Sequence, residues 1–220
     1  MSTHFTRRDV TRLAAAATLA ASCTTRGAAH PVQESGAMHA IRHAVIPAPV
    51  RFDGDRGEFT FRSGMMITYT KTDVAPIAER FCLEVTRRTG LRILPTAGNP
   101  GSNEPSVRID LANGGELEAL PAPLGLSPSG DGAPDERHSL TIDQHQVAVR
   151  AAEPIGVARG LTTLIQLLAA TPSTKTGEVS LPGAWILDAP RYAWRGLSLD
   201  VARTFFTVDE VRRVIDLLAL

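Results

Sequence analysis

The sequence predicts an α+β domain that is followed by the first strand and helix of a second domain. Between residues 41 and 184, short apolar–polar alternations are mixed with two stripes of helical spacing. Between residues 185 and 220, a single strand-like run precedes a single amphipathic run. We therefore expect a mixed or antiparallel sheet with helices on one face, and then one strand–helix unit. Because one such unit cannot bury its own apolar surface, the second domain is expected to be truncated.

Composition narrows the classes of function. The chain has 220 residues of which 43% are hydrophobic, enough for a buried core and one or two domains. Its 23 basic residues balance its 23 acidic ones, so nothing indicates nucleic acid or an anionic membrane as a partner. Aromatic residues, at 5%, are too sparse to favour stacking of single-stranded bases. Cys23 and Cys82 offer neither a disulfide framework nor the spacing of a zinc site.

The first 29 residues have the pattern of an export signal. A positive start that includes Arg7 and Arg8 precedes an apolar run, residues 13–21, which is too short to span a bilayer. Residues 6–12 resemble the twin-arginine export motif, which a receptor recognises. The alternative is an ordinary alanine-rich, disordered start. Export is the prediction, and it places the protein in the periplasm, on the cell envelope or outside the cell.

Cys23 is a candidate lipidation site. Residues 19–23, Leu-Ala-Ala-Ser-Cys, resemble a bacterial lipobox, in which the cysteine becomes the lipid-modified first residue. The leucine lies one position farther from the cysteine than is usual, so export without a lipid anchor stays open. Residues 24–40 are rich in Ala, Gly, Ser and Thr. They predict a flexible tether, with residues 30–40 as the linker to the folded domain.

Alternating apolar residues predict the strands of the domain at 41–184. The clearest pattern is a hairpin, residues 140–142 and 147–151, around a polar turn. Residues 44–50 contain two prolines and predict an extended lead-in or an edge strand. A Pro/Gly/Ser loop is expected over residues 121–134. Further short strands are expected at residues 58–61, 66–69 and 107–111.

Apolar residues at helical spacing predict two helices in this domain. Between residues 73 and 89, Ile77, Phe81 and Val85 recur every fourth position. Gly90 follows at the position where a left-handed residue would end the helix. A second stripe runs along residues 161–168.

Three stretches carry a resemblance to a known family. Residues 46–49 are Ile-Pro-Ala-Pro, residues 160–167 are Gly-Leu-Thr-Thr-Leu-Ile-Gln-Leu, and residues 188–206 are Asp-Ala-Pro-Arg-Tyr-Ala-Trp-Arg-Gly-Leu-Ser-Leu-Asp-Val-Ala-Arg-Thr-Phe-Phe. They resemble the opening and close of the N-terminal domain, and then the first barrel strand and loop, of bacterial β-N-acetylhexosaminidases (glycoside hydrolase family 20). The resemblance covers residues 41–220 and is most specific at 191–206. It implies a domain at 41–184 and the first βα unit of a truncated (β/α)8 barrel at 185–220.

The resemblance implies that Arg195 binds hydroxyls of the terminal, non-reducing sugar. A guanidinium has five fixed N–H donors, which suit vicinal sugar oxygens. Without the family, the alternative is a structural ion pair, for which Asp200 would be the partner. Asp200 could instead hold the Arg195 side chain in place while Arg195 binds substrate. The family commonly has histidine where this chain has Thr204, so no role is carried over to that position.

Other residues near Arg195 have simpler interpretations. Trp194 is expected to pack against other side chains, and Arg203 and Asp209 to be loop and helix-capping residues. His138 and His145 are expected at the surface and not as metal ligands. The acidic residues of the polar loops are expected to be solvated surface charges, namely Glu116, Glu118, Asp135 and Glu136.

The family's reaction is a retaining hydrolysis in which the substrate's own acetamido oxygen attacks the anomeric carbon. An aspartate orients that amide, and a neighbouring glutamate is the general acid and base. The resemblance places this pair on a later barrel strand, so the present chain alone is expected to be inactive. It implies no cofactor and a carbohydrate substrate with a terminal N-acetylhexosamine. The alternative is an exported, non-catalytic module that binds carbohydrate or a protein partner.

Overall fold

The computed structural model describes residues 36–99, 105–125, 133–173 and 177–219. The predicted export signal and Cys23 lie outside these residues. Among the described residues, no helix combines the length and the apolar character that crossing a bilayer requires.

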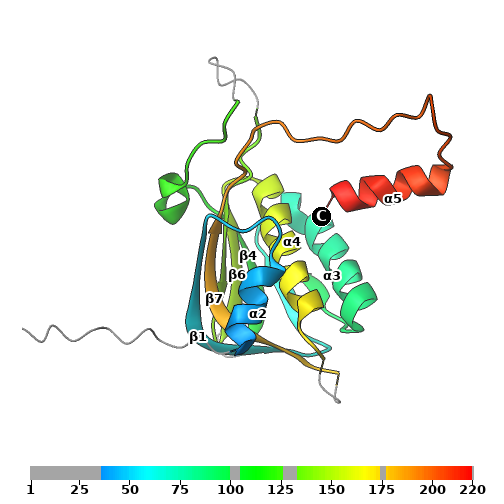
Figure 1. The fold of residues 1–220 in the computed structure, drawn as a ribbon. Coiled ribbons are helices and arrows are strands. Elements are labelled where there is room, and N and C mark those ends of the chain that lie inside the picture. Colours follow the sequence, from blue (N-terminus) through cyan, green and yellow to red (C-terminus); the bar gives the residue numbers. More distant parts are fainter. Residues whose placement is uncertain (1–35, 100–104, 126–132, 174–176, 220) are drawn as a thin grey trace, which may run out of the picture. The chain divides into compact units, whose positions relative to one another are not determined.

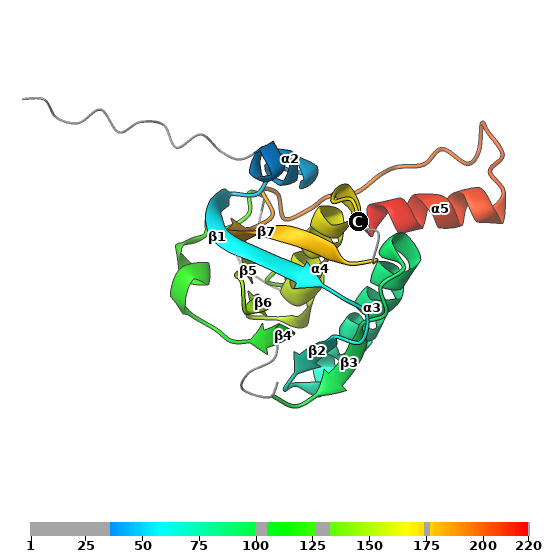
Figure 2. The ribbon, with the colours of Figure 1, turned by 90° about the horizontal axis from the view of Figure 1, so that it is seen from below.

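A seven-stranded mixed sheet forms the framework, in the order β1-β7-β5-β6-β4-β2-β3. Its β1–β7, β7–β5 and β5–β6 pairs are antiparallel, whereas β6–β4, β4–β2 and β2–β3 are parallel. Helices α2, α3 and α4 cover one face (Figures 1 and 2). The predicted α+β class, with helices on one face, is confirmed. The strands are β1 Arg51–Phe61, β2 Met66–Tyr69, β3 Leu94–Ala97, β4 Ser106–Leu111, β5 His138–Ile142, β6 Gln146–Ala151 and β7 Val179–Asp188.

The helices follow the apolar stripes. Helix α3, Ala75–Thr89, buries Phe81 and Val85 and ends at Gly90, whose φ of 79° is left-handed as predicted. Helix α4, Pro154–Ala170, buries Leu161, Leu164, Ile165 and Leu168. The remaining helical segments are α2 Gly36–Ala44, α5 Val208–Leu218, and the short 3-10 helices η1 Thr72–Val74 and η2 Gly115–Ala119.

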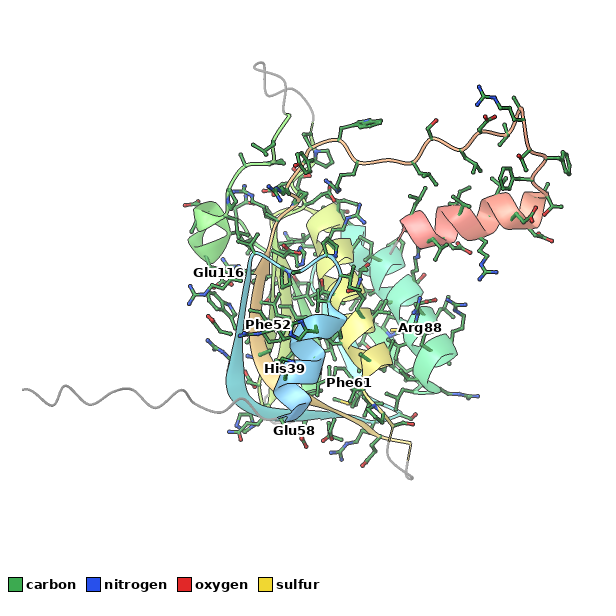
Figure 3. The ribbon with its side chains drawn as sticks, in the orientation of Figure 1. His39, Phe52, Glu58, Phe61, Arg88 and Glu116 are labelled. Carbon is green, nitrogen blue, oxygen red and sulfur yellow. The ribbon has the colours of Figure 1, made fainter. Side chains whose placement is uncertain are left out.

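The main core lies between the sheet and these helices. Phe59 and Phe61 of β1 are completely enclosed there, and Phe61 can be seen on the side of the sheet that faces the helices (Figure 3). A second, smaller cluster joins η2 to β7 through Leu117 and Leu187. Glu116 of η2 lies beyond the opposite face of the sheet in the same view. Strand β7, which lies between β1 and β5, therefore has apolar side chains buried on both of its faces.

The start of the domain differs from the sequence prediction. Residues 36–40 were expected in a flexible linker, but they form the first half of α2. Ile41 of that helix is buried in the main core, which explains why the segment is ordered. The lead-in after α2 forms no strand, and the Gln166 side chain of α4 holds it by bonding both the N–H and the carbonyl of Ile46, at 2.8 and 3.0 Å.

The end of the chain also differs. The buried strand expected after Pro190 is absent: residues 193–200 are exposed or partly exposed coil. A parallel barrel strand depends on hydrogen bonds to neighbours at its edges, and no described strand pairs with this segment. The amphipathic run does form a helix, α5, which begins at a capping box between Thr207 and Glu210. Asp209 lies in its first turn, as expected, and none of its residues is buried.

Candidate functional site

Arg195 lies in coil just after the domain and reaches back to it. Its Nη2 donates to both carboxylate oxygens of Glu136, at 2.7 and 2.6 Å. Its Nη1 donates to the carbonyl oxygen of Tyr192 at 2.5 Å. The Arg195 side chain is 38% exposed, so part of the guanidinium stays open to solvent. The partner that the sequence had offered, Asp200, instead pairs with Arg203 at 3.3 Å and accepts the N–H of Ala202.

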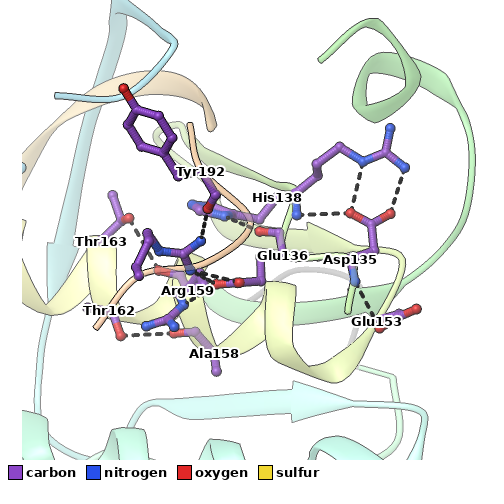
Figure 4. Close-up of polar contacts among 11 residues, drawn as sticks. Asp135, Glu136, His138, Glu153, Ala158, Arg159, Thr162, Thr163 and Tyr192 are labelled. Carbon is purple, nitrogen blue, oxygen red and sulfur yellow. Dashed lines mark hydrogen bonds and ion pairs between the residues drawn. The ribbon is translucent and has the colours of Figure 1, made fainter. Parts of the chain in front are cut away.

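Glu136 joins two arginines from different parts of the chain. Besides Arg195, it accepts a hydrogen bond from Nε of Arg159 on α4, at 2.7 Å (Figure 4). Its side chain is only 11% exposed, which corrects the expectation of a solvated surface charge. Burial alone would raise the pKa of this carboxyl, but the hydrogen bonds from Arg195 and Arg159 outweigh it and the pKa lies below its usual value. Glu136 is therefore an ionised anchor.

Asp135 also departs from the expectation of a free surface charge. Its carboxylate binds the Arg137 guanidinium through both oxygens, at 2.8 and 2.7 Å, and its N–H donates to Glu153 (Figure 4). Arg137 in turn donates to the carbonyl of Leu117 in η2. These bonds fix the backbone that carries Glu136. The carboxylates of η2 are closer to the prediction, since Glu118 is exposed and Glu116 partly so.

His138, expected at the surface, is buried at 3% exposure. Its Nδ1 lies 3.1 Å from the carbonyl oxygen of Glu136, which makes Nδ1 the donor and leaves Nε2 without a partner among the described residues. Desolvation lowers the pKa of the imidazole, so the neutral form is favoured. His145 is exposed in the β5–β6 turn, as expected. Within the described ranges, no three His, Cys, Asp or Glu side chains are grouped to hold a metal ion.

Asp188 closes β7 opposite His138, its register partner on β5. Its Oδ1 accepts the N–H groups of Val50 and Ala189, at 3.2 and 2.8 Å. Burial raises the pKa of the Asp188 carboxyl, and the neighbouring His138 opposes this. Asp188 therefore ties the lead-in before β1 to the point where the chain leaves the domain.

These groups line a cleft of about 980 Å³. The polar residues that line it include Glu136, His138, Arg159, Asp188 and Arg195. The walls are largely apolar and include Val45, Ile46, Pro47, Val50, Leu124, Pro190, Tyr192 and Leu218. A cleft with apolar walls and a few converging polar groups is the usual form of a ligand or docking site.

The other residues that the sequence singled out behave differently. Trp194 was expected to pack, but it is 84% exposed. Cys82 is a free thiol inside the domain, and burial raises its pKa to about 11. Cys23 lies outside the described residues. One signal in the sequence could have predicted that His138 is buried. Residues 138, 140 and 142 are spaced two apart in β5, so the side chains of His138, Leu140 and Ile142 lie on the same face of the strand, which is the core face. Nothing local indicates that Arg159 meets Glu136.

The fold and this junction define a class of protein, an α+β domain that leads directly into the start of a second domain. The model of glycosyl hydrolase family 20, domain 2, matches residues 42–189, and that of the family's catalytic domain matches residues 192–220. The chain belongs to glycosyl hydrolase family 20, which confirms the resemblance seen in the sequence. Arg195 falls in the catalytic match, and Glu136 and Arg159 fall in the domain 2 match.

Individual relatives agree with the family models. A β-N-acetylhexosaminidase of Cellulomonas fimi is 44% identical over 87 residues, which are 40% of this chain and 17% of that protein. A β-hexosaminidase of Porphyromonas gingivalis is 24% identical over 180 residues, covering 80% of this chain and 21% of that protein. The chain therefore spans about a fifth of the length of these relatives.

Solved structures share the fold. The family 20 β-N-acetylhexosaminidase of Streptomyces coelicolor A3(2) matches with a TM-score of 0.61 and 30% identity, over 81% of this chain and 32% of that one. A mutant Streptomyces plicatus β-hexosaminidase in complex with its product GlcNAc matches with a TM-score of 0.62 and 32% identity, over the same shares of the two chains.

Proposed function

We propose that the chain is the N-terminal part of an exported glycosidase that removes terminal, non-reducing N-acetylhexosamine residues from glycoconjugates or chitooligosaccharides. The observation that carries this proposal is the order of the two family matches, with domain 2 ending at residue 189 and the catalytic domain beginning at 192. Relatives named as β-N-acetylhexosaminidases support the sugar class. A product-bound relative containing GlcNAc supports the same class.

The proposed reaction is substrate-assisted and retaining, with the acetamido-orienting Asp and the acid/base Glu beyond residue 220. Two Asp-Glu dipeptides within the described residues do not fit these roles. A general acid must be protonated at the working pH, which requires a raised pKa. The pKa of Glu136 is instead held below its usual value by the two arginines that outweigh its burial. The pKa of Glu210 is lowered by its hydrogen bonds to Thr207 in the helix cap.

Arg195 is the proposed substrate contact in this chain. Three of its N–H···O contacts are made to protein, one by Nη1 and two by Nη2. A guanidinium has five N–H donors, so two remain, one of them on Nε. Those two donors lie on different edges of the guanidinium, and each is free to bind a sugar hydroxyl. The guanidinium cannot transfer a proton at any relevant pH, so its role is binding only.

The activity test compares the 220-residue chain with the full reading frame that contains it. The full protein should hydrolyse a chromogenic N-acetyl-β-D-glucosaminide, whereas the 220-residue chain should not. The matched substrate is the corresponding β-D-glucoside, which lacks the acetamido group and should be hydrolysed far more slowly. Hydrolysis by the 220-residue chain would overturn the placement of the catalytic pair. Equal rates on the two substrates would overturn the substrate-assisted mechanism, and an inactive full protein would overturn the proposed function.

Export through the twin-arginine route is part of the proposal and rests on the sequence of residues 6–21. Replacing Arg7 and Arg8 together by lysine preserves the charge but not the motif, so accumulation outside the cytoplasm should stop. Undiminished export of this double variant would contradict the twin-arginine route.

Lipid attachment at Cys23 is a separate proposal. Incorporation of a labelled fatty acid should disappear in Cys23→Ser, and the absence of label in the wild-type protein would remove the anchor from the account.

A further inference from the structure

Helix α2 carries two histidines that lie about one helical turn apart. His39 and His43 are at positions i and i+4 of Gly36–Ala44, and both residues are exposed. The centres of the two imidazole rings are 4.6 Å apart, with an angle of 63° between the ring planes. Figure 3 labels His39 on this helix. Because residues four apart share one face of an α-helix, the two rings form a single patch that is open to solvent.

The rest of the helix is anchored in the domain, which fixes the direction of the histidine face. Ile41 and Val45, directly after the helix, are both buried in the main core. The Arg42 guanidinium donates to the carbonyl oxygen of Phe52 in β1 at 3.0 Å and lies over the Phe52 ring. These contacts hold one side of α2 against the domain and leave His39 and His43 on the solvent side. The neighbouring positive charge of Arg42 is engaged with β1.

The spacing of the two rings suits a shared metal ion. Neutral imidazole is the commonest metal ligand among protein side chains, and two histidines at i and i+4 on one helix face are an established zinc-binding pattern. With each ring nitrogen about 2.1 Å from one zinc ion, the ring centres would lie about 4.5–5 Å apart. The observed 4.6 Å falls within this range. Since both residues are exposed, rotation about the side-chain bonds can direct one nitrogen of each ring to the same ion.

The surroundings of the pair define what kind of metal site it can be. In the zinc-protease pattern a glutamate that follows the first histidine is the general base, but Ala40 occupies that position here. Among the residues that the structure describes, no third His, Cys, Asp or Glu side chain completes the group. The remaining coordination positions are therefore left to water or a small anion, and no hydrolytic chemistry is expected at this site.

We propose that His39 and His43 form a two-ligand binding site for one divalent transition-metal ion, with Zn²⁺ as the ion to be tested. The ion links two successive turns of α2, a nine-residue helix that is too short to be stable by itself. The inference is independent of the proposed glycosidase function, because it uses no residue of the catalytic match. The competing explanation is that the two rings only pack against each other. Zn²⁺ would then bind α2 no better than it binds a single exposed histidine such as His145.

Calorimetric titration of the 220-residue chain with Zn²⁺ tests the site, with Cys23→Ser in every protein to remove a competing thiol. His39→Gln and His43→Gln should each weaken binding at least roughly tenfold, because the second imidazole of a chelate binds at a high effective concentration. The double variant should lose little more than either single variant, since one histidine alone cannot chelate. The matched control is His145→Gln, which removes an exposed histidine from the β5–β6 turn and should keep the affinity of the parent protein.

Two results of the titration would overturn the site. One is an unchanged affinity in either single variant. The other is a double variant that loses clearly more than the single variants, which would mean that the two histidines bind separate ions. Misfolding is checked by urea unfolding without metal, where all the variants should have nearly the same midpoint because both histidines are exposed.

Amide hydrogen exchange shows where the ion binds. Zn²⁺ should slow the exchange of the α2 amides several-fold in the parent protein, because an ion held between two turns opposes opening of the helix. The effect should disappear in His43→Gln and on addition of a chelator. Exchange that is unaffected by Zn²⁺ in the parent protein would overturn the proposed link, and slowing that persists in His43→Gln would place the ion elsewhere.

Discussion

Helix α4 lies so close to the sheet that two of its glycines have no room for a methyl group. A Cβ added at Gly156 would lie 2.6 Å from the carbonyl oxygen of Arg137. A Cβ at Gly160 would lie 2.6 Å from Cγ1 of Val149. The two glycines are four residues apart, so they share the face of α4 that meets β5 and β6. We predict that Gly156→Ala and Gly160→Ala both destabilise the domain, although alanine is the better helix former.

The expected change in the free energy of unfolding is the difference between two opposing effects. Replacing a helical glycine by alanine stabilises by about 1 kcal/mol. Forcing an extra methyl group into a packed site costs about 1–3 kcal/mol. At Gly156 the obstacle is a backbone carbonyl, which cannot rotate away, so the net loss should be roughly 2 kcal/mol. At Gly160 the obstacle is a side-chain methyl, which can shift slightly, so the net loss should be roughly 1 kcal/mol.

Urea unfolding followed by far-UV circular dichroism measures these losses as a lower midpoint at constant slope. Gly36→Ala is the control, because no heavy atom lies within 4 Å of a Cβ added there. Val149→Ala removes the methyl that Gly160→Ala would meet, so the double variant should lose less than the sum of the single losses. A Gly156→Ala protein as stable as wild type would show that α4 does not pack against the sheet as described.

Two further predictions concern titratable groups inside the domain. Burial raises the pKa of Cys82 to about 11. Alkylation of this thiol at pH 8 should therefore be at least roughly tenfold slower in the folded protein than in urea, as measured by mass spectrometry of the tryptic peptide that contains it. Equal rates would show an accessible thiol. Desolvation lowers the pKa of His138 in the folded protein, so the unfolded chain binds the proton more readily. The free energy of unfolding should therefore decrease as the pH falls below about 6.5, the ordinary pKa of histidine. The stability of wild type relative to His138→Phe should therefore decline between pH 7 and pH 5, and parallel pH profiles of the two proteins would contradict the buried, neutral imidazole.

Local patterns were sufficient for part of the fold. Helix α3 with its Gly90 cap, helix α4, and the β5–β6 hairpin each have a periodicity that can be recognised in one stretch of sequence. Strand β7 was not predicted, because Pro182 and Gly183 interrupt it with residues that usually break strands. The structure accommodates them at an irregularity in the β1–β7 pairing, where Gly183 passes close to the backbone of Arg56. That compensation comes from β1, far earlier in the chain, so the local sequence does not show it.

The candidate site also combines residues that a local pattern could predict with residues that only the fold brings together. Arg195 could be named because it lies in a contiguous motif, whereas its protein partner Glu136 is 59 residues away and Arg159 is 23 residues from Glu136. Only the order of strands in the sheet brings β5, α4 and the segment after β7 to one cleft. The barrel strand predicted around Arg195 does not form for a related reason. Its apolar pattern is that of a strand with hydrogen-bonded neighbours on both sides, and no described strand takes that place.

The proposed role of Arg195 as a substrate-binding residue is tested most directly by kcat/KM of Arg195→Ala in the full protein. Loss of charged hydrogen bonds to the sugar should lower kcat/KM by roughly two orders of magnitude. The midpoint of urea unfolding should fall only slightly, because the Arg195–Glu136 pair is partly exposed. Wild-type kcat/KM in Arg195→Ala would contradict the account and leave Arg195 as a structural partner of Glu136.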